Sequence, residues 1–511
     1  MTPSTSVDVL ICGAGASGLT LGIELARRGV SFRLIEKAPA PFQGSRGKGI
    51  QPRTLEIFDD LGVLDRMAAT GAAYPNVRVH HGDGSVSEAP AIEAAEPTPA
   101  EPYGTPLMLP QFLTEGILRD RLAELGGAVE YGHALVGFTQ ANAGVNAQVA
   151  GPDGEETVHA CFLIAADGGR SFIRRTLDIG FPGKELGVRA IVADVNLSGL
   201  DREAWHRFGD GDMQRQLAVC PLAGTDLFQI QAPIPLEGDV DLSVEGLDAF
   251  VHARTGHDEV RVHVVHWASA YTMSARLADR YRIGDIFLVG DAAHVHPPTG
   301  GQGLNTSTQD AYNLGWKLAA VLKGAPPSLL DTYEEERRPI AAGMLGLATR
   351  MLDTLVTQGS MRRTRETRQL DLGYAGHSLA LEAPLREAAP LLAGDRAPDA
   401  PLLGAAGQRV RLFDLFRGPH WTLLGIDADR ARMTPRVGVE LHLIGTHQSL
   451  RDDTGHFADT YGLGTGDWIL IRPDGYIGAV VDAAHVDALL AYMDGAGLTP
   501  RHDRLTCSAA A

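Results

Sequence analysis

Several features are scarce in this sequence of 511 residues, and each absence excludes a class of protein. The four cysteines form no CxxC pair, so neither a disulfide framework nor a zinc site is expected at Cys12, Cys161, Cys220 or Cys507. Cys12 and Cys161 lie in apolar, strand-like runs, which predicts buried, inert thiols. Long apolar segments and a basic leader are also lacking, which predicts neither a membrane span nor a secretion signal. A cytoplasmic protein with reduced thiols fits these absences.

Basic residues are outnumbered by acidic ones. The 45 Lys and Arg residues face 63 Asp and Glu residues, which gives a formal net charge of −18, and no basic stripe offsets it. This balance argues against a surface that binds nucleic acid or an anionic membrane. With 44% hydrophobic and 21% charged residues the composition is that of a globular protein, and the length predicts two or three domains.

The N-terminal residues predict a strand–helix–strand unit built for a dinucleotide. Residues 7–12 form a β-rich run, the segment 13–18 reads GAGASG, and a helical pattern and a second strand at 31–35 follow. The glycines permit a tight turn and a close approach of the backbone to a pyrophosphate, which the helix N-terminus stabilises. Glu36 stands 18 positions after Gly18, near the spacing of about 20 expected for an acid that binds a ribose hydroxyl.

Two later segments favour a flavin dinucleotide over a nicotinamide dinucleotide. The segment 167–175, DGGRSFIRR, follows an apolar run, and the segment 290–305, GDAAHVHPPTGGQGLN, follows another. Asp291 is placed to accept hydrogen bonds from a ribityl chain. A helix that begins near residues 303–305 would direct its N–H groups at the flavin pyrimidine carbonyl, which gains negative charge on reduction. The alternative is that Asp291 and Asn305 only cap helices.

The rest of the chain predicts further domains. Residues 50–70 and 111–125 read as helical, 75–110 as irregular, and 181–275 as short strands of a sheet inserted into the nucleotide domain. After a linker at 394–401, strand runs alternate with a final helix, which predicts a separate α/β domain. The predicted divisions are 1–180 (with 75–110 contributing to the substrate domain), 181–275, 276–393 and 394–511.

As a set, these segments resemble the FAD-dependent aromatic hydroxylases, the single-component flavoprotein monooxygenases related to p-hydroxybenzoate and phenol hydroxylases. The resemblance extends to SRGKGIQPRTLE at 45–56, to Pro110-Gln111 and to TYEEERRP at 332–339, and it covers most of residues 5–345. Residues 414–416 and RPDGYI at 472–477 resemble the thioredoxin-like tail of the phenol-hydroxylase and polyketide-hydroxylase branch.

The resemblance implies an α/β fold of three parts. These are a Rossmann-like FAD-binding domain, an inserted mixed β-sheet substrate domain and a C-terminal thioredoxin-like α/β domain. Because the tail has no CxxC pair, it is expected to pack against a partner subunit in a homo-oligomer and not to carry thiol chemistry.

Position by position, the resemblance also implies an extended FAD site. The residues at the pyrophosphate would be Gly13, Gly15, Ala16, Ser17, Gly18, Asp167 and Gly168. Those at the adenosine would be Glu36, Lys37 and Leu135, and those along the phosphates and the ribityl chain Arg46, Gln111 and Asp291. The isoalloxazine ring would lie against Pro298, Gly301, Gly303, Leu304 and Asn305.

The implied chemistry is hydroxylation of an aromatic, phenolic or polyketide-like substrate. NADPH or NADH reduces FAD, O2 then gives a C4a-hydroperoxyflavin, and the electron-rich ring attacks its distal oxygen. Tyr271 resembles the tyrosine that hydrogen-bonds the phenol oxygen in phenol hydroxylases, and otherwise it is a core tyrosine whose hydroxyl has a backbone partner. Lys48 stands where phenol hydroxylases have an aspartate, so it would stabilise a phenolate or a ligand carboxylate, or be solvated.

Other side chains allow more than one interpretation. His294 and His296 form an HxH pair beside Asp291, and their place in the flavin loop of the resembled family favours a structural or ring-edge role over a metal site. The side chains expected to line the substrate pocket, some of which would be ordinary sheet core, are Trp205, Met213, Gln214, Phe228, Gln229, Gln231 and Trp267.

Two other functions fit the same segments. Baeyer–Villiger oxygen insertion or epoxidation would use the same fold with a nucleophilic flavin peroxide, and a non-catalytic protein would bind FAD without turnover. Products made with labelled O2 separate the first from hydroxylation, and NADPH oxidation stimulated by aromatic compounds separates the second. The expected partner is a small aromatic substrate, with neither nucleic acid nor membrane.

Overall fold

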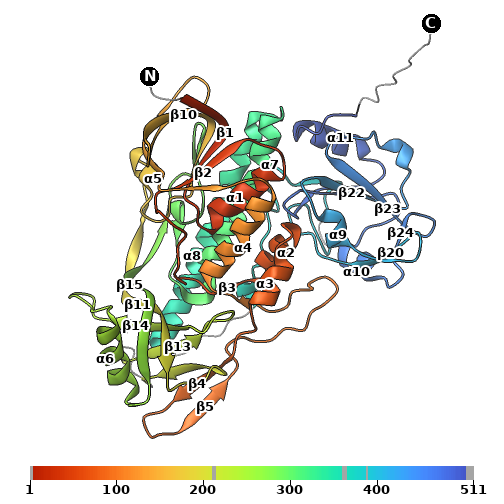
Figure 1. The fold of residues 1–511 in the computed structure, drawn as a ribbon. Helices are drawn as coiled ribbons and strands as arrows, with labels where there is room; N and C mark the ends of the chain where they lie inside the picture. The colour runs from red at the N-terminus through yellow and green to blue at the C-terminus, as the bar shows by residue number, and fades with distance from the viewer. Residues whose placement is uncertain (1–3, 210–214, 359–364, 387–388, 502–511) are drawn as a thin grey trace. The chain divides into compact units, whose positions relative to one another are not determined.

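The computed structural model describes residues 4–209, 215–358, 365–386 and 389–501, which divide into two compact units (Figure 1). The first comprises residues 1–96, 103–315 and 337–370, and the second comprises 97–102, 316–336 and 371–511. Met213, Gln214 and Cys507 lie outside the described residues. None of the helices in the described ranges is long and apolar enough to cross a membrane.

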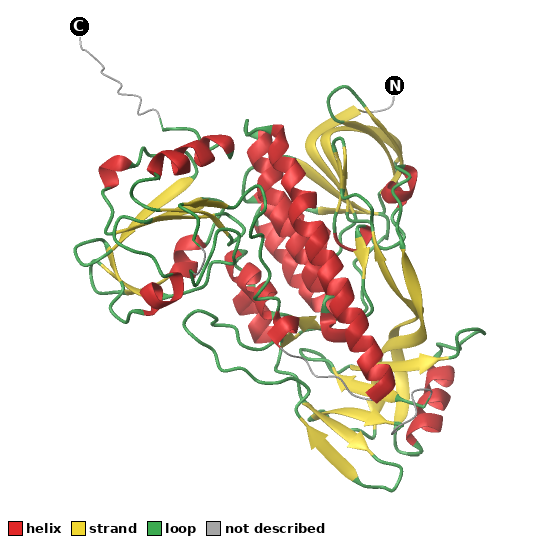
Figure 2. Cartoon of the chain, turned by 180° about the vertical axis from the view of Figure 1, so that it is seen from behind, coloured by secondary structure: helices red, strands yellow, loops and turns green. Residues whose placement is uncertain are grey.

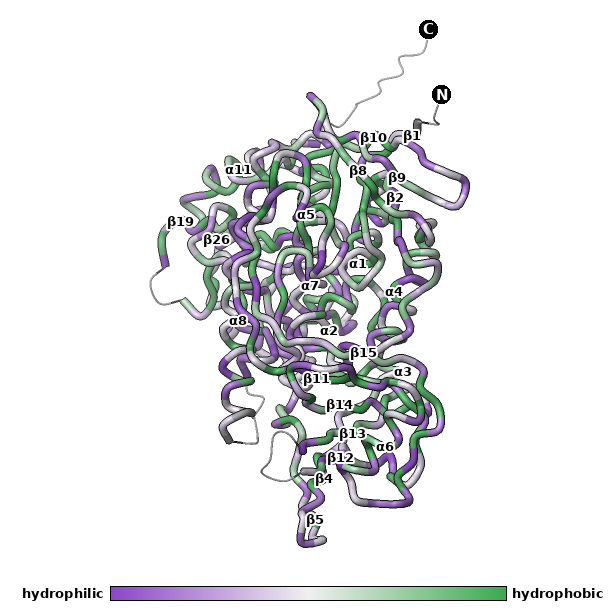
Figure 3. The backbone as a smooth tube through the Cα atoms, turned by 90° about the vertical axis from the view of Figure 1, so that its left-hand side faces the viewer, coloured by the Kyte–Doolittle hydropathy of each residue, from purple (hydrophilic) through white to green (hydrophobic). Residues whose placement is uncertain are grey.

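A mostly parallel sheet of the first unit, the nucleotide sheet, carries the glycine-rich segments. Its strands, in spatial order, are β16 (Arg282–Ile283), β17 (Ile286–Leu288), β10 (Gly154–Ala165), β1 (Ser4–Cys12), β2 (Phe32–Glu36) and β7 (Val129–Tyr131), and the antiparallel strands β9 (Val145–Gly151) and β8 (Ala134–Gln140) extend from β10. The central strands are apolar and buried, as strands of a parallel sheet covered on both faces are, and Figure 3 shows their hydrophobic residues in green.

The carboxyl ends of these parallel strands are aligned. Cys12 pairs with Ala165, which in turn pairs with Leu288 of β17, and Ile35 of β2 lies opposite Cys12. Because parallel strands release their following loops at one edge of the sheet, the segments 13–18, 167–175 and 290–305 leave from the same edge. The three segments that the sequence singled out are therefore brought together.

A second sheet of the first unit, the substrate sheet, is mostly antiparallel. Its order is β18 (His294–Val295), β15 (Arg261–Leu277), β11 (Gly183–Ser198), β14 (Phe228–Ile234), β13 (Leu217–Pro221), β12 (Ala204–Phe208), β4 (Asn76–His80) and β5 (Val86–Ala89). The long strands β11 and β15 are prominent as yellow ribbons in Figure 2. A short pair, β3 (Gly49–Ile50) with β6 (Leu107–Met108), lies apart from both sheets.

The two faces of the substrate sheet differ in polarity. One face packs Ile191, Ile230 and Phe228 against Leu247 and Val251 of α6 (Val244–Thr255) in an apolar core. The other face carries polar and aromatic side chains, because residues two apart along a strand share a face. Pairing of β11 with β14 and β15 puts Asp194, Gln229 and Trp267 side by side on that second face, which we call the polar face.

The remaining helices of the first unit connect these strands. They are α1 (Ala16–Ala26), α2 (Pro52–Asp60), α3 (Leu64–Thr70), α4 (Gln111–Glu124) and α5 (Phe172–Thr176). Helices α7 (Gly303–Leu322) and α8 (Asp331–Gln358) contribute residues to both units. Helix α1 starts directly at the glycine-rich turn, with Gly15 as its N-cap residue.

The second unit is built on one sheet with helices on its faces. Its strand order is β19 (Leu381–Ala383), β26 (Ile477–Val481), β25 (Trp468–Ile471), β22 (Trp421–Ile426), β23 (Val439–Ile444), β24 (Leu450–Arg451), β20 (Pro401–Gly404) and β21 (Arg409–Arg411), with helices α9 (Leu412–Phe416), α10 (His456–Tyr461) and α11 (Val486–Gly495). Strands β22 and β23 are parallel, whereas β25 and β26 run antiparallel, which is the pattern expected of a thioredoxin-like domain.

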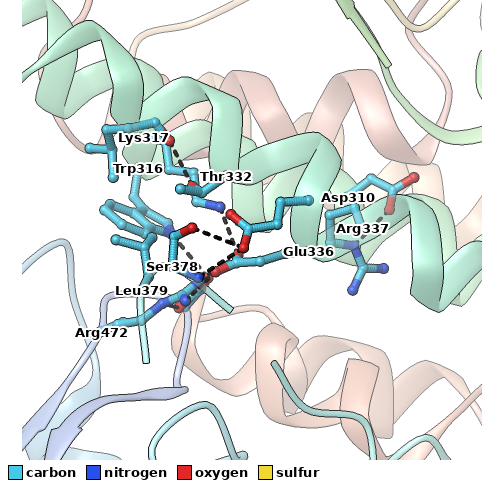
Figure 4. Close-up of polar contacts among 12 residues, drawn as sticks. Asp310, Trp316, Lys317, Thr332, Glu336, Arg337, Ser378, Leu379 and Arg472 are labelled. Atoms are coloured by element: carbon cyan, nitrogen blue, oxygen red, sulfur yellow. Dashed lines mark hydrogen bonds and ion pairs between the residues drawn. The ribbon is translucent and has the colours of Figure 1, made fainter. Parts of the chain in front are cut away.

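A buried ionic network inside the second unit explains two of the recognised segments (Figure 4). Glu336, from 332–339, accepts hydrogen bonds from Lys317 Nζ at 2.7 Å and from Arg472 at 2.6 and 2.9 Å. Asp474, from 472–477, accepts from Arg472 at 2.6 and 2.9 Å and from Trp316 Nε1 at 3.0 Å. Burial lowers the pKa of Lys317 to about 8. Both segments therefore have a structural role here, because a buried charge requires such partners.

Three local expectations are wrong. Residues 75–110 are not irregular throughout, since they contain β4, β5 and β6, and β5 gave no alternating signal because all four of its residues are exposed. The segment 181–275 is not only strands, since it includes α6, which buries just two residues. Cys161 is exposed, because it lies on the outward side of β10.

Candidate functional site: a cofactor edge and a polar face

Of the three glycines in the glycine-rich turn, only Gly15 has space beside its backbone for a ligand. A Cβ on Gly13 (φ +109°) would lie 2.2 Å from the Ala166 carbonyl oxygen, and one on Gly18 would lie 1.9 Å from the Gly13 carbonyl oxygen. These two glycines are required by backbone approach. A Cβ on Gly15 would meet only Glu115 Oε1, at 3.7 Å, so the backbone here is open to a bulky anion such as a pyrophosphate.

Glu36 orders the turn from the end of β2. Its two carboxylate oxygens accept hydrogen bonds from the backbone N–H groups of Ala14, at 3.0 Å, and Ala38, at 2.9 Å. Lys37 beside it is exposed. Nearby in β7, the hydroxyl of Tyr131 is buried with no hydrogen-bond partner in the described part of the chain, which leaves a polar atom for a ligand to satisfy.

The second segment is fixed to the third by an arginine. Asp167 Oδ2 accepts from the N–H groups that begin α5, at 2.7 and 3.2 Å, while its Oδ1 is buried and has no partner among the described residues. Gly168 turns the chain with φ +79°. Arg174 donates to the carbonyl oxygens of Ala292, at 2.7 Å, and Gly169, at 2.9 Å. Arg174 therefore holds the two cofactor segments at a constant separation.

Asn305 is more than a helix cap. Its Oδ1 accepts from Gln51 N at 2.8 Å, and its Nδ2 donates to the carbonyl oxygens of Gly49, at 2.9 Å, and Gly301, at 2.7 Å. Gln51 Nε2 in turn donates to the Gly300 carbonyl oxygen at 3.0 Å. The segment 49–51 is thereby tied to the start of α7, next to Gly303 and Leu304.

Asp291 follows Gly290 at the start of the third segment. The side chain is exposed to solvent, and yet the surrounding protein desolvates it enough to raise the pKa of its carboxyl group, an effect that His294 and Arg46 oppose. It accepts no hydrogen bond from any described residue, so capping is not its role here. An accessible, enclosed and unbonded carboxylate fits the hydroxyl groups of a ribityl chain. Pro298 is also exposed.

The HxH pair belongs to a buried network. His294 Nε2 is 2.6 Å from Asp310 Oδ2, and its Nδ1 is 3.0 Å from His296 Nε2. Arg337 Nε donates to Asp310 Oδ1 at 2.8 Å. Burial lowers the pKa of His296 to about 3, so its ring is neutral. These contacts give the pair a structural role within the segment 290–305, and a ring-edge role stays a prediction.

The segment 42–48 joins the cofactor edge to the polar face. Ser45 donates to the buried Asp194 of β11 through its backbone N, at 2.7 Å, and its Oγ, at 2.5 Å. Arg46 stacks over Trp267 of β15 at 5.9 Å. Arg46 also lowers the pKa of Asp291 by its charge, so the two lie near each other. One short segment therefore contacts both parts of the site.

Lys48 is buried and directed at the polar face. Its ammonium group donates to Gln229 Oε1 and lies 4.7 Å from the centre of the Trp205 ring. Gln231 Nε2 donates to the same Gln229 oxygen at 2.8 Å. Since only 8% of the lysine is exposed, the solvated alternative is wrong. Phe228, by contrast, belongs to the apolar core under α6 and does not line this face.

Tyr271 shares the polar face with Trp267. The two are four residues apart in a regular stretch of β15, opposite Ala190 and Asp194 of β11. The Tyr271 hydroxyl has no hydrogen-bond partner in the described ranges, which favours a free donor over the backbone-bonded alternative. Burial raises its pKa to about 12, so it remains a hydrogen-bond donor at neutral pH.

Several residues that build the site were missed in the sequence. Glu115 in α4 is 2% exposed, and Gln111 Nε2 donates to its Oε1 at 2.8 Å. Asp194 and Arg174 were not singled out either, although an acid inside the apolar run AIVADVNL was a usable signal. Leu135 lies half-buried in β8, where nothing ties it to the turn, so its adenine contact stays a prediction.

Comparisons with known proteins agree with this site. A family model described as an FAD binding domain matches residues 6–348. A flavin-dependent monooxygenase of Mycobacteroides abscessus is 41% identical over 483 residues, which is 93% of this chain and 98% of that protein. The 12-dehydrotetracycline 5-monooxygenase/anhydrotetracycline 6-monooxygenase of Streptomyces rimosus is 34% identical and covers 92% of this chain and 94% of its own. The crystal structure of the flavin-dependent monooxygenase PieE in complex with FAD and substrate has a TM-score of 0.85 at 26% identity, over 96% of this chain and 99% of that chain. The chain therefore belongs to the FAD-dependent aromatic hydroxylases and is an FAD-dependent monooxygenase.

Proposed function

We propose that this monooxygenase hydroxylates a phenolic or enolic ring of a polyketide-like aromatic compound, with NAD(P)H as electron donor and O2 as co-substrate. One observation supports the proposal above the others. The segment 42–51 is bonded on one side to the start of α7 at the cofactor edge, and on the other to the polar face of the substrate sheet. A ring held on that face is held next to the cofactor, as oxygen transfer to a ring requires.

The residues at the cofactor edge fit FAD. The open backbone at Gly15 suits the pyrophosphate, and so does Asp167 Oδ1, which no described residue satisfies. The Asp291 carboxylate, which no described residue bonds, suits the ribityl hydroxyls. The N-terminus of α7 would lie against the isoalloxazine, where its positive end favours the reduced ring. Bound FAD supplies the electron transfer from NAD(P)H and the activation of O2.

Two side chains of the polar face are proposed to handle the substrate oxygen. No described residue bonds the protonated Tyr271 hydroxyl, so it is free to donate a hydrogen bond to a phenol or enolate oxygen. The Lys48 ammonium stabilises negative charge on that oxygen, which makes the ring a better nucleophile. The aromatic faces of Trp205 and Trp267 suit a flat, fused-ring compound. The relative from Streptomyces rimosus is named for such fused-ring substrates, anhydrotetracycline and 12-dehydrotetracycline.

Turnover with labelled oxygen tests the reaction. Fused-ring phenols that stimulate NADPH consumption should yield a product with one ¹⁸O atom from ¹⁸O2 on an aromatic or enolic carbon. A labelled lactone or epoxide would replace hydroxylation by the Baeyer–Villiger or epoxidation alternative, and no stimulated NADPH consumption with any such compound would leave only flavin binding.

Replacing Tyr271 by Phe tests the substrate role. The variant should hydroxylate about 10²–10⁴ times more slowly, because proton and hydrogen-bond assistance in a transition state contributes that much. Flavin reduction by NADPH, measured by stopped-flow absorbance, is the internal control and should change far less. Equal slowing of both steps would remove Tyr271 from this role.

We infer a cytoplasmic protein, which the free thiols of Cys12, Cys161 and Cys220 support. We also infer that residues 394–511 pack against a second copy, because this segment has no CxxC pair for thiol chemistry. Light scattering on full-length and 394–511-deleted protein would test the dimer.

A further inference from the structure

A buried carboxylate lies beside the turn at which the cofactor's pyrophosphate is expected. Glu115, in the first half of α4, is 2% exposed. Its Oε1 lies 3.7 Å from the position a Cβ would take on Gly15, and the backbone N–H of Ala16 is close enough to lower the pKa of the carboxyl group. Gly15 and Ala16 are the residues at which the helix N-terminus of α1 is offered to a pyrophosphate.

The charges around Glu115 do not hold it as an anion. Among the described residues, the titratable groups that act on it include Arg119 from its own helix, Glu36 at the end of β2, and Tyr131 of β7, whose own pKa burial raises. Arg119 and the hydrogen bond from Gln111 favour the carboxylate, whereas burial and Glu36 disfavour it. Burial dominates and raises the pKa of Glu115 to about 7.

A pyrophosphate and an ionised Glu115 cannot share this turn at low cost. The pyrophosphate diester of FAD is a dianion, and like charges at contact distance in a partly desolvated site repel strongly. Glu115 has little room to leave, because it is buried and Gln111 Nε2 holds it at 2.8 Å. A proton removes the conflict, since a protonated carboxyl group has an O–H that donates to a phosphate oxygen.

We propose that Glu115 lies in contact with the pyrophosphate when FAD is bound at the turn, and that FAD binds the form in which Glu115 carries a proton. FAD binding at neutral to alkaline pH then takes up one proton. This inference rests on FAD binding at the turn and assigns Glu115 as a cofactor-binding residue beyond the glycine-rich segment itself.

The sign of the pH dependence follows from linkage. Bound FAD raises the proton affinity of Glu115 further, so the complex holds a proton that the free protein has lost. The association constant is therefore highest below about pH 7 and falls above it by up to about tenfold per pH unit, which is the limit for one proton. It levels off only when Glu115 ionises in the complex as well.

Calorimetry on the full-length protein tests this proposal. FAD is titrated into protein stripped of flavin at pH 8, in two buffers of different ionisation enthalpy, and the difference in observed heat gives the number of protons taken up. Affinity is also measured from pH 6 to pH 9 by quenching of FAD fluorescence. We expect close to one proton taken up at pH 8 and an affinity that falls by at least about tenfold over this range.

Two variants assign the proton. Glu115→Gln should abolish the uptake, flatten the pH profile and bind FAD more tightly than the wild type at pH 9, because its side chain is neutral at every pH. Glu124→Gln, which removes an exposed carboxylate from the same helix, should keep the wild-type profile. A profile that is flat in the wild type, or equally steep in Glu115→Gln, would overturn the proposal. Failure of FAD to bind at any pH would instead contradict the cofactor site.

Discussion

The buried state of Glu115 makes a prediction that needs no cofactor. In the folded protein the pKa of its carboxyl group is raised to about 7 from an ordinary 4.5. The folded state therefore keeps a proton that the unfolded chain loses above pH 4.5, so this group contributes stability at low pH that is lost as the pH rises through 7. At about 1.4 kcal/mol per pH unit of difference, the full effect is about 3 kcal/mol, most of which falls between pH 5 and pH 8.

The assay compares flavin-free wild type and Glu115→Gln by urea denaturation at several pH values. Glutamine has the same shape and no charge. The free energy of unfolding of the variant minus that of the wild type should therefore increase by about 2–3 kcal/mol as the pH is raised from 5 to 8. The matched control is Glu124→Gln, where Arg121 and Arg66 lower the native pKa, so its pH-dependent effect lies below about pH 4.5 and its difference from the wild type should stay nearly constant from pH 5 to pH 8. A difference between wild type and Glu115→Gln that stays constant with pH would refute the reasoning.

Three other changes probe separate parts of the site and fold. Asp291→Ala should weaken FAD binding about ten- to a hundredfold, because a charge-assisted hydrogen bond contributes about 1.5–3 kcal/mol; unaltered affinity in a fluorescence titration would contradict its ribityl role. Asp194→Ala leaves the Ser45 N–H and hydroxyl without their buried acceptor and should lower the free energy of unfolding by about 1–3 kcal/mol. A loss below about 0.5 kcal/mol would mean that the Asp194–Ser45 hydrogen bonds do not stabilise the fold. Glu336→Gln leaves Lys317 and Arg472 without their anion and should cost about 3–5 kcal/mol in the same assay, whereas Glu334→Gln nearby serves as the comparison.

The features that the sequence predicts well are those imposed by local geometry. A Cβ at Gly13 or Gly18 would lie too close to a backbone carbonyl oxygen, so only glycine fits at these two positions. The spacing of the glycines therefore indicates the turn. The apolar runs of β1, β10 and β17 indicated a parallel sheet, and the family comparisons confirm the fold class and the FAD-dependent monooxygenase. The roles of the individual residues at the cofactor edge remain proposals.

Contacts between distant segments were the part that the sequence did not reveal. Asp194 binds Ser45 across 149 positions, and no local pattern marks that pairing. Glu115 was not singled out in the predicted helix 111–125, because its burial depends on the fold and not on a local pattern. For the same reason Cys161 was assigned to the wrong side of its strand, since an apolar run does not say which residues the neighbouring layer covers.

The Asp194–Ser45 pair has a consequence for engineering the specificity of this enzyme. Strands β11 to β15 could be exchanged for those of another hydroxylase to change which rings are accepted, while the flavin machinery is retained. Such a chimera would need an acid at the position of Asp194, because that side chain anchors the recipient's loop through two short hydrogen bonds. If the other hydroxylase has an apolar residue at that position, the transplanted strands would bring a new binding surface, but that surface would no longer be hydrogen-bonded to the recipient's segment 42–48.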